Sequence, residues 1–292
     1  MTRLAGLHAA LVTPFRADGR LNAEVVADLV DLELAQGIDG FYVGGSTGEA
    51  FLQSREERAE MLRAVAAAAG GRCALIAHVG AIATGEAIAL AEVAAEAGYH
   101  AISSIPPFYY KFGVEEIVGH YRQLAAASPL PVICYNFPDM SGVQFTTATL
   151  IELLRSPGFV GLKHTSSNFF QLERVHRALP ETLIFNGYDE QLLAGLAMGA
   201  DGAIGSTYNY MGRLFVALCR RFADGALDEA RALQARANDM IDVITEIGFL
   251  PATKALLALQ GVDCGPCRAP FRTVTTGEMK RLESALAALP VA

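Results

Sequence analysis

One lysine stands apart from the other charged residues of this 292-residue sequence. The chain has four lysines, and Lys163 directly follows an apolar run, residues 159–162. A lysine kept partly uncharged by burial is a nucleophile that can form a Schiff base with a keto group. The alternative is a strand-end lysine whose ammonium reaches solvent, and position alone does not decide between the two. The remaining lysines lie in polar contexts and are expected to be solvated: Lys111, Lys254 and Lys280.

A tyrosine ends a second apolar run. Tyr135 closes the run 132–135 and is followed by Asn136-Phe137-Pro138. At the end of a strand its phenol can relay a proton between a substrate and an imine. Taken alone, a core tyrosine whose hydroxyl bonds to the backbone is the simpler interpretation.

A glycine-rich loop, Gly44-Gly45-Ser46-Thr47-Gly48-Glu49, follows the apolar run 41–43. Its glycines allow close backbone approach, and its hydroxyls and amides suit an anion. The spacing of Ser46 and Glu49 also matches a helix capping box, which needs no ligand. The loop is not a nucleotide-binding P-loop, because no Gly-Lys-Ser/Thr follows it.

The same loop matches G-x-S-x-G, the nucleophile elbow of α/β-hydrolases. This pattern predicts a competing function, a serine hydrolase with Ser46 as the nucleophile. His176 falls inside a predicted helix, so His164 would have to be the base. No His-Gly-Gly-Gly segment for an oxyanion hole is present.

Polar residues follow two further apolar runs. Asp189 and Glu190 come shortly after the run 183–185, and Ser206 comes after 202–204. Carboxylates at such a position can accept hydrogen bonds from sugar hydroxyls, or can simply charge the first turn of the next helix. The candidates that follow predicted strands are Ser46, Thr47, Tyr135, Lys163, Thr165, Asp189, Glu190 and Ser206.

Short apolar runs alternate with longer amphipathic ones along the chain, which predicts βα units and a parallel sheet. The expected strands are 7–11, 40–43, 74–78, 101–105, 131–135, 159–162, 183–185 and 202–204. The expected helices include 55–69, 86–97, 114–127, 147–155, 168–179 and 190–198. Eight such units favour a closed (β/α)8 TIM barrel over residues 1–223, with a C-terminal helical extension, 224–292, packed on it. A closed barrel would gather all these strand ends in one mouth.

Composition limits the function further. Hydrophobic residues make up 52% and charged residues 18%, so the chain can bury a large core. A net charge of −8 argues against nucleic acid as a partner. No apolar run is long enough for a membrane span and no signal peptide is evident, so we expect a cytoplasmic protein. The Cys264-Gly265-Pro266-Cys267 segment is interpreted as a coincidental C-x-x-C, and no metal site is expected.

The sequence resembles the family of pyruvate-dependent class I aldolases that includes dihydrodipicolinate synthase and N-acetylneuraminate lyase. The resemblance rests on Gly44-Gly45-Ser46-Thr47-Gly48-Glu49, Tyr135-Asn136-Phe137-Pro138 and Gly161-Leu162-Lys163, and it covers nearly the whole chain. The lyase branch matches best, because Ser141-Gly142-Val143 lacks the arginine usual in the synthase branch. His164, Ser167 and Asn168 depart from the lyase pattern beside the key positions.

The resemblance implies a homotetrameric enzyme that cleaves N-acetylneuraminate to N-acetylmannosamine and pyruvate. It implies that Lys163 forms a Schiff base with the keto carbon, with no cofactor, and that Ser46 and Thr47 bind the pyruvate carboxylate. Tyr135 would relay a proton, supported by Tyr110 reaching a neighbouring subunit. The sugar would be held by Thr165, Gly187, Asp189, Glu190 and Ser206. Two alternatives stay open: another aldolase of this family acting on a different 2-keto-3-deoxy acid, and the serine hydrolase.

Overall fold

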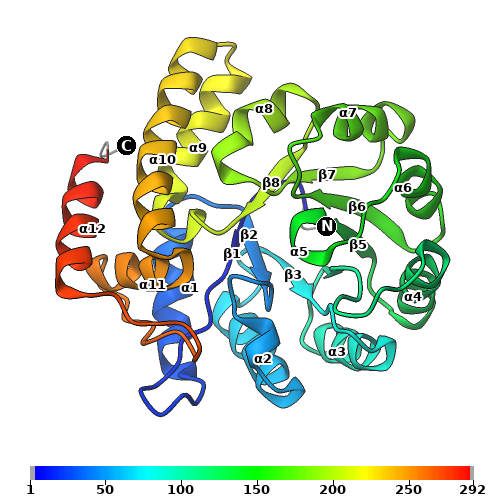
Figure 1. Ribbon diagram of the computed structural model, residues 1–292, viewed down its shortest axis with the longest axis horizontal. Helices are drawn as coiled ribbons and strands as arrows, with labels where there is room; N and C mark the ends of the chain where they lie inside the picture. Colours follow the sequence, from blue (N-terminus) through cyan, green and yellow to red (C-terminus); the bar gives the residue numbers. More distant parts are fainter. Residues whose placement is uncertain (1–3, 290–292) are drawn as a thin grey trace.

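Eight parallel strands close into a barrel with helices around its outside (Figure 1). The computed structural model describes residues 4–289. Each strand pairs with the next in chain order, and β8 closes the ring by pairing with β1. The strands are β1 (Gly6–Ala10), β2 (Gly40–Val43), β3 (Ala74–His78), β4 (Ala101–Ser104), β5 (Val132–Asn136), β6 (Phe159–His164), β7 (Leu183–Asn186) and β8 (Gly202–Gly205). The (β/α)8 barrel predicted from the alternating runs is confirmed.

Helices follow the strands and form the outer layer of the barrel. They are α1 (Val26–Leu34), α2 (Arg55–Ala69), α3 (Thr84–Glu96), α4 (Val114–Ala127), α5 (Pro138–Ser141), α6 (Thr147–Leu154), α7 (Phe169–Ala178), α8 (Leu192–Ala197) and α9 (Tyr208–Ala223). Within residues 4–289, no helix combines the length and apolar character needed to cross a bilayer.

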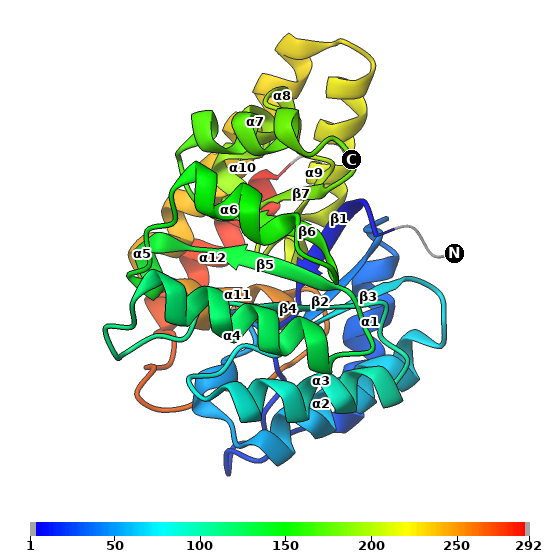
Figure 2. The ribbon, with the colours of Figure 1, turned by 90° about the vertical axis from the view of Figure 1, so that its right-hand side faces the viewer.

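Three more helices lie beside the barrel at its α9 side (Figures 1 and 2). They are α10 (Leu227–Ile247), α11 (Phe249–Leu259) and α12 (Thr276–Ala288). Helix α10 packs along α9, and α11 and α12 pack against α10. The chain therefore ends in a helical extension on the barrel, as expected, whereas the division at residues 223 and 224 stays a prediction.

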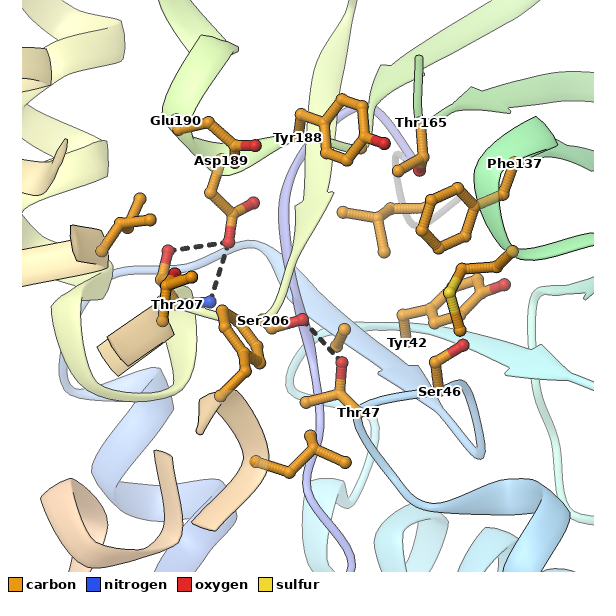
Figure 3. A pocket seen from close by; sticks show the side chains of 18 of the residues that line it. Tyr42, Ser46, Thr47, Phe137, Thr165, Tyr188, Asp189, Glu190, Ser206 and Thr207 are labelled. Carbon is orange, nitrogen blue, oxygen red and sulfur yellow. Dashed lines mark hydrogen bonds between the residues drawn. The ribbon is translucent and has the colours of Figure 1, made fainter. Parts of the chain in front are cut away.

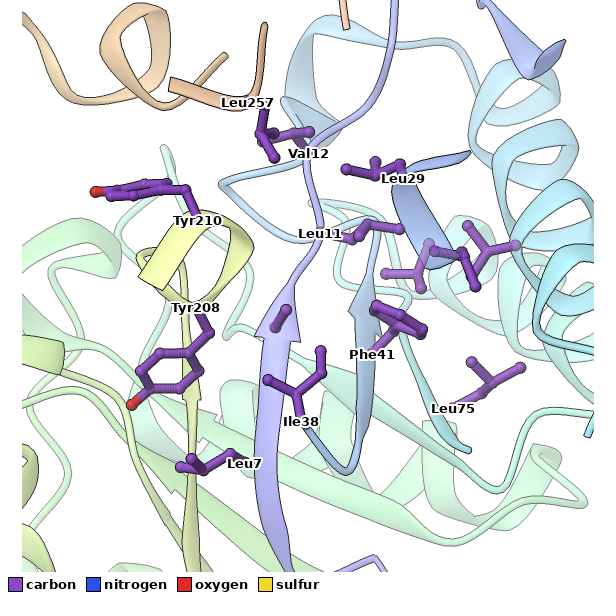
Figure 4. Packing of buried hydrophobic residues seen from close by; sticks show 14 of the residues in the cluster. Leu7, Leu11, Val12, Leu29, Ile38, Phe41, Leu75, Tyr208, Tyr210 and Leu257 are labelled. Carbon is purple, nitrogen blue, oxygen red and sulfur yellow. The ribbon is translucent and has the colours of Figure 1, made fainter. Parts of the chain in front are cut away.

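Both faces of the strands are buried, which is why their sequences are continuous apolar runs. The larger hydrophobic cluster fills the layer between strands and helices, where Leu7, Phe41 and Leu75 meet side chains such as Leu29 and Tyr208 (Figure 4). A smaller cluster occupies the barrel interior, including Tyr42, Ile133, Tyr135, Phe185 and Ile204. The two layers together hold the strand ends in fixed positions.

Strands β5 and β6 extend beyond their predicted ends. They run to Asn136 and His164, so Lys163 lies inside its strand rather than after it, and Tyr135 is no longer the last residue of its strand. The paired backbones continue past the apolar runs, with Tyr135 opposite Lys163 and Asn136 opposite His164. Polar side chains are accommodated here because one face of each strand end opens into the mouth of the barrel.

Candidate active site

A cavity of about 530 Å³ opens at the carboxyl ends of the strands (Figure 3). Nine of the ten residues singled out in the sequence line it: Ser46, Thr47, Tyr135, Lys163, Thr165, Gly187, Asp189, Glu190 and Ser206. These residues come from the ends of β2, β5, β6, β7 and β8. The barrel thus brings together side chains that lie up to 160 positions apart in the chain.

Lys163 lies near the end of β6 with only 5% of its surface exposed. Its Nζ is 4.2 Å from the centre of the Tyr135 ring and 4.3 Å from the centre of the Tyr42 ring. Burial lowers the pKa of Lys163 from 10.5 to about 7, and the nearby carboxylate of Asp189 acts in the opposite direction. Near neutral pH a substantial fraction of the amine is therefore uncharged and nucleophilic.

Tyr135 occupies the adjacent position on β5. Its ring stacks on Phe137 with 5.6 Å between ring centres, and only 3% of the residue is exposed. Burial raises the pKa of Tyr135 well above its usual value, while the Thr165 hydroxyl acts in the opposite direction. The phenol consequently keeps its proton near neutral pH, and a neutral phenol can both donate and accept a hydrogen bond.

The loop after β2 contributes Ser46 and Thr47, with their hydroxyls, to the lining of the cavity (Figure 3). Thr47 Oγ1 and Ser206 Oγ, from the loops after β2 and β8, lie 2.6 Å apart and share a hydrogen bond (Figure 3). His78 Nδ1 bonds the Gly44 carbonyl at 2.8 Å, which holds the start of the loop. Among residues 4–289, neither the Ser46 nor the Thr47 amide donates to a protein acceptor. These amides are available to a carboxylate.

The capping-box interpretation of this loop is wrong. Glu49 adopts the left-handed conformation, with φ 56°, and its side chain caps no helix. The capping box belongs instead to Ser54 and Glu57, at the start of α2. A capping box is therefore present, but it lies eight residues after the predicted position. Only a short 3-10 helix, Ala50–Leu52, follows the loop itself.

Two carboxylates form another wall of the cavity. Asp189, in the 3-10 helix Asp189–Gln191, accepts hydrogen bonds through Oδ2 from the Thr207 amide at 2.8 Å and from the Thr207 hydroxyl at 2.7 Å (Figure 3). Within residues 4–289 its buried Oδ1 has no hydrogen-bond partner. Burial raises the pKa of Asp189, and the bonds from Thr207 oppose this effect. Burial also raises the pKa of the half-buried Glu190.

The backbone at Gly187 passes directly against Thr165. A Cβ atom at position 187 would collide with the Thr165 hydroxyl. Only glycine therefore lets the loop after β7 approach Thr165, at the end of β6, this closely.

The C-terminal extension supplies a wall that the sequence did not indicate. Apolar side chains from α10, α11 and the segment after α11 line the cavity: Ile241, Ile247, Phe249, Leu250 and Phe271. No local pattern identifies them, because they meet the barrel mouth only through tertiary packing. Tyr42 was likewise missed, since it sits within an apolar strand.

The expectation that Lys254 is solvated is wrong. Its side chain is 4% exposed, and its Nζ forms an ion pair at 2.7 Å with Glu49, whose side chain is fully buried. Nζ also donates to the Pro266 carbonyl at 3.1 Å and lies 4.5 Å from the centre of the Phe15 ring. The partner lies 205 positions earlier in the chain, which is why local context gave no sign of it.

Tyr110 is the one predicted site residue that does not line the cavity of its own chain. It lies in the loop after β4, is 63% exposed, and contacts the rings of Tyr109 and Phe112. The role that the family resemblance implies for it, in a neighbouring subunit, stays a prediction.

The serine hydrolase is not favoured. Both ring nitrogens of His164 lie against other groups: Nδ1 is 3.2 Å from Asn136 Nδ2, and Nε2 is 3.2 Å from the Asn168 carbonyl. Neither partner is Ser46. Burial also lowers the pKa of His164 to about 4.

Cys264 and Cys267 are free thiols, and burial raises the pKa of each to about 12. Thiols of this kind are poor nucleophiles near neutral pH. Within the part of the chain that the structure describes, no three His, Cys, Asp or Glu side chains cluster as metal ligands would.

Comparisons with known proteins agree with this geometry. The model of the dihydrodipicolinate synthetase family matches residues 3–289. The chain belongs to this family. One family member, an N-acetylneuraminate lyase of Rhizobium meliloti, is 53% identical over 98% of this chain and 95% of its own.

Solved structures of the family are similar throughout. A Clostridium difficile protein crystallised with mannosamine superposes with a TM-score of 0.96 at 33% identity, covering 98% of this chain and 99% of that one. The wild-type sialic acid aldolase of Ruminococcus gnavus gives a TM-score of 0.93 at 31% identity, covering 97% of this chain and 96% of that one. The likeness therefore extends over both the barrel and the C-terminal helices.

Proposed function

We propose that this chain is a Schiff-base aldolase that reversibly cleaves N-acetylneuraminate to N-acetylmannosamine and pyruvate. The observation that carries the proposal is the buried Lys163 amine, with its pKa lowered to about 7, directly beside the Tyr135 phenol. The names of the relatives, an N-acetylneuraminate lyase and a sialic acid aldolase, support the choice of substrate.

The lysine opens the reaction. Its neutral amine attacks the keto carbon of the open-chain sugar acid, and loss of water leaves a protonated imine. This cation accepts the electrons of the C3–C4 bond as that bond breaks, which gives an enamine and releases the aldehyde sugar. Protonation of the enamine and hydrolysis of the imine then release pyruvate and restore the amine. No cofactor is required, because the imine itself is the electron sink.

Proton transfer at the C4 oxygen falls to Tyr135. The C4 hydroxyl must lose its proton as the aldehyde forms, and the phenol lies next to the imine nitrogen. A neutral phenol can accept that proton while passing its own to a neighbouring oxygen. Ser46 supplies a hydroxyl in the same cavity.

The two ends of the substrate have different binding sites. The amides of Ser46 and Thr47, which donate to no acceptor among residues 4–289, suit the carboxylate together with the two hydroxyls. Hydroxyls of the sugar can donate hydrogen bonds to the carboxylates of Asp189 and Glu190. Asp189 Oδ1 is a buried acceptor that receives no hydrogen bond within residues 4–289, so it favours a ligand that carries a hydrogen-bond donor. The sugar part of this site also includes Thr165, Gly187 and Ser206.

A cytoplasmic homotetramer is part of the same proposal. The exposed Tyr110 would then contact the active site of a neighbouring subunit. Light scattering after size exclusion measures the assembly directly, and a monomer with full activity would remove Tyr110 from the site.

The decisive experiment measures pyruvate release from N-acetylneuraminate, followed by borohydride reduction in the presence of pyruvate. We expect turnover, and a covalent adduct that peptide mass spectrometry places on Lys163. Lys163→Arg keeps the positive charge but cannot form the imine, so it should abolish both signals while leaving the fold intact.

Substrate comparison tests the sugar assignment separately. If simpler 2-keto-3-deoxy acids without an N-acetyl group are cleaved much faster than sialic acid, the aldolase chemistry stands and the chain acts on another acid. If wild-type protein gives no adduct with pyruvate, the aldolase itself is refuted.

A further inference from the structure

Tyr42 lies against the reacting nitrogen and has no part in the chemistry described above. It stands on β2, is 1% exposed, and turns its side chain into the barrel mouth beside Ser46 (Figure 3). Its ring centre is 4.3 Å from Lys163 Nζ, and the Tyr135 ring centre is 4.2 Å from the same atom. The two rings meet edge to face, at 85° with 6.2 Å between centres. The nitrogen therefore has an aromatic ring on two sides.

We propose that Tyr42 is a further catalytic residue, whose ring stabilises the positive charge that Lys163 carries as an imine. This proposal rests on the aldolase function proposed above and deepens it. The neutral amine, the keto group and one proton give the iminium cation and water. The new charge lies on Nζ, within the range at which the negative face of an aromatic ring attracts a cation.

Few other groups near Nζ can balance this charge. Within the part of the chain that the structure describes, the titratable groups around it are Tyr42 on β2, His78 on β3, Tyr135 on β5 and Asp189 after β7. His78 is neutral near pH 7, because burial lowers its pKa to about 3. Among residues 4–289, Asp189 is the carboxylate that acts on Lys163, and its Oδ2 already accepts hydrogen bonds from Thr207. Aromatic faces therefore form a large part of the cation's surroundings.

The ring of Tyr42, rather than its hydroxyl, is the active part. The hydroxyl donates a hydrogen bond at 3.1 Å to Oγ of Ser103, a fully buried residue on β4. Burial raises the pKa of Tyr42 well above its usual value, so the phenol does not ionise near neutral pH. The hydroxyl thus fixes the plane of the ring, and it is not positioned as a proton relay.

The first experiment separates the ring from the hydroxyl through imine formation with pyruvate. Near pH 7 a substantial fraction of the amine is neutral, and imine formation takes up one proton, so the pyruvate concentration that gives half-maximal borohydride trapping reports on the iminium cation. Tyr42→Leu should raise that concentration about five- to thirtyfold, the effect expected of a desolvated cation–π contact. Tyr42→Phe keeps the ring and should raise it by less than about threefold.

Ser103→Ala serves as the matched control, since it removes the partner of the hydroxyl and leaves both rings in place. Thermal unfolding, monitored by circular dichroism, checks that each variant is folded. If Tyr42→Leu does not fold, Tyr42→Met is used in its place. Equal effects of the Leu and Phe variants, or wild-type trapping in Tyr42→Leu, would overturn the proposal.

The second experiment uses no substrate. The rate at which an amine-reactive reagent labels Lys163, followed by mass spectrometry against pH, gives the titration midpoint of the amine. Tyr42→Leu removes a stabiliser of the ammonium, so its midpoint should lie about one pH unit below that of Tyr42→Phe. An equal or higher midpoint contradicts the proposed contact. If Tyr42→Leu lowers the titration midpoint of Lys163 but the wild-type protein forms no adduct with pyruvate, the proposed aldolase function is refuted. The contact between the Tyr42 ring and the Lys163 ammonium is then still supported.

Discussion

Replacing either buried lysine by methionine should change the free energy of unfolding, and in opposite directions. Lys163 is buried and forms no ion pair with any of residues 4–289, whereas Lys254 is buried in an ion pair with Glu49. Methionine is unbranched, apolar and similar in length to the lysine stem. Lys163→Met should therefore stabilise the protein near neutral pH, and Lys254→Met should destabilise it.

The magnitude for Lys163 follows from its pKa. Burial lowers this pKa from 10.5 to about 7 in the folded state. At about 1.4 kcal/mol for each pH unit, holding the ammonium in the folded protein costs about 5 kcal/mol at low pH, where both states are protonated. Between the two pKa values the folded amine is neutral and the unfolded one protonated, so stability rises with pH. The cost is about 4 kcal/mol at about pH 7 and about 2 kcal/mol at about pH 9.

The assay is urea unfolding of wild type and Lys163→Met at several pH values between about 7 and 9. Protein concentration is held constant, because any assembly of subunits adds to the apparent stability. We expect Lys163→Met to be the more stable protein by about 4 kcal/mol at about pH 7, and the difference to shrink by about 2 kcal/mol at about pH 9.

Lys254→Met provides the contrast. Removing this ammonium leaves the carboxylate of Glu49 buried without its counter-charge, which should cost about 3–5 kcal/mol. A difference between wild type and Lys163→Met that does not change with pH would refute the lowered pKa of Lys163. If Lys163→Met is less stable than wild type at about pH 7, a counter-ion must balance the charge of Lys163, and the reasoning is wrong.

Three further predictions concern catalysis. The value of kcat/KM for sialic acid should fall about tenfold per pH unit below about pH 7, because Lys163 becomes protonated. A pH profile of kcat/KM whose midpoint lies near the pKa of free lysine would contradict the lowered pKa of Lys163. Tyr135→Phe should lower kcat by about a hundredfold or more while borohydride trapping of pyruvate changes little, because the variant loses a proton relay and no carboxylate contact. Asp189→Ala should abolish turnover of sialic acid but still trap pyruvate, and unchanged turnover would remove Asp189 from the sugar site.

Much of the fold could be predicted because parallel barrel strands are buried on both faces. Their apolar runs are easily recognised against the amphipathic helices between them. The ends of β5 and β6 were placed too early, since hydropathy falls at Asn136 and Lys163 while backbone pairing continues. Polar side chains can lie inside a strand where the strand reaches the barrel mouth. A prediction based on apolar runs therefore ends such a strand too early.

The candidate site was predictable to the extent that it lies at strand ends. Ser46, Lys163 and Asp189 each follow or end a recognisable strand, and the closed barrel requires that they meet. Tyr42 could not be distinguished from a core residue, because its role depends on the position of Lys163 across the barrel. The contacts of the C-terminal helices with the cavity could not be predicted from local sequence either, because they too depend on tertiary packing.

The ion pair between Lys254 and Glu49 joins the C-terminal helices to the loop that follows β2 at the active site. Glu49 holds a left-handed conformation, which costs a non-glycine residue about 1 kcal/mol or more. That conformation turns the chain just after Ser46 and Thr47, which line the cavity. Two contacts from the C-terminal extension hold it: the ammonium of Lys254 at 2.7 Å and the amide of Arg268 at 2.7 Å. The extension therefore both lines the cavity and holds Glu49, at the end of the loop that carries Ser46 and Thr47.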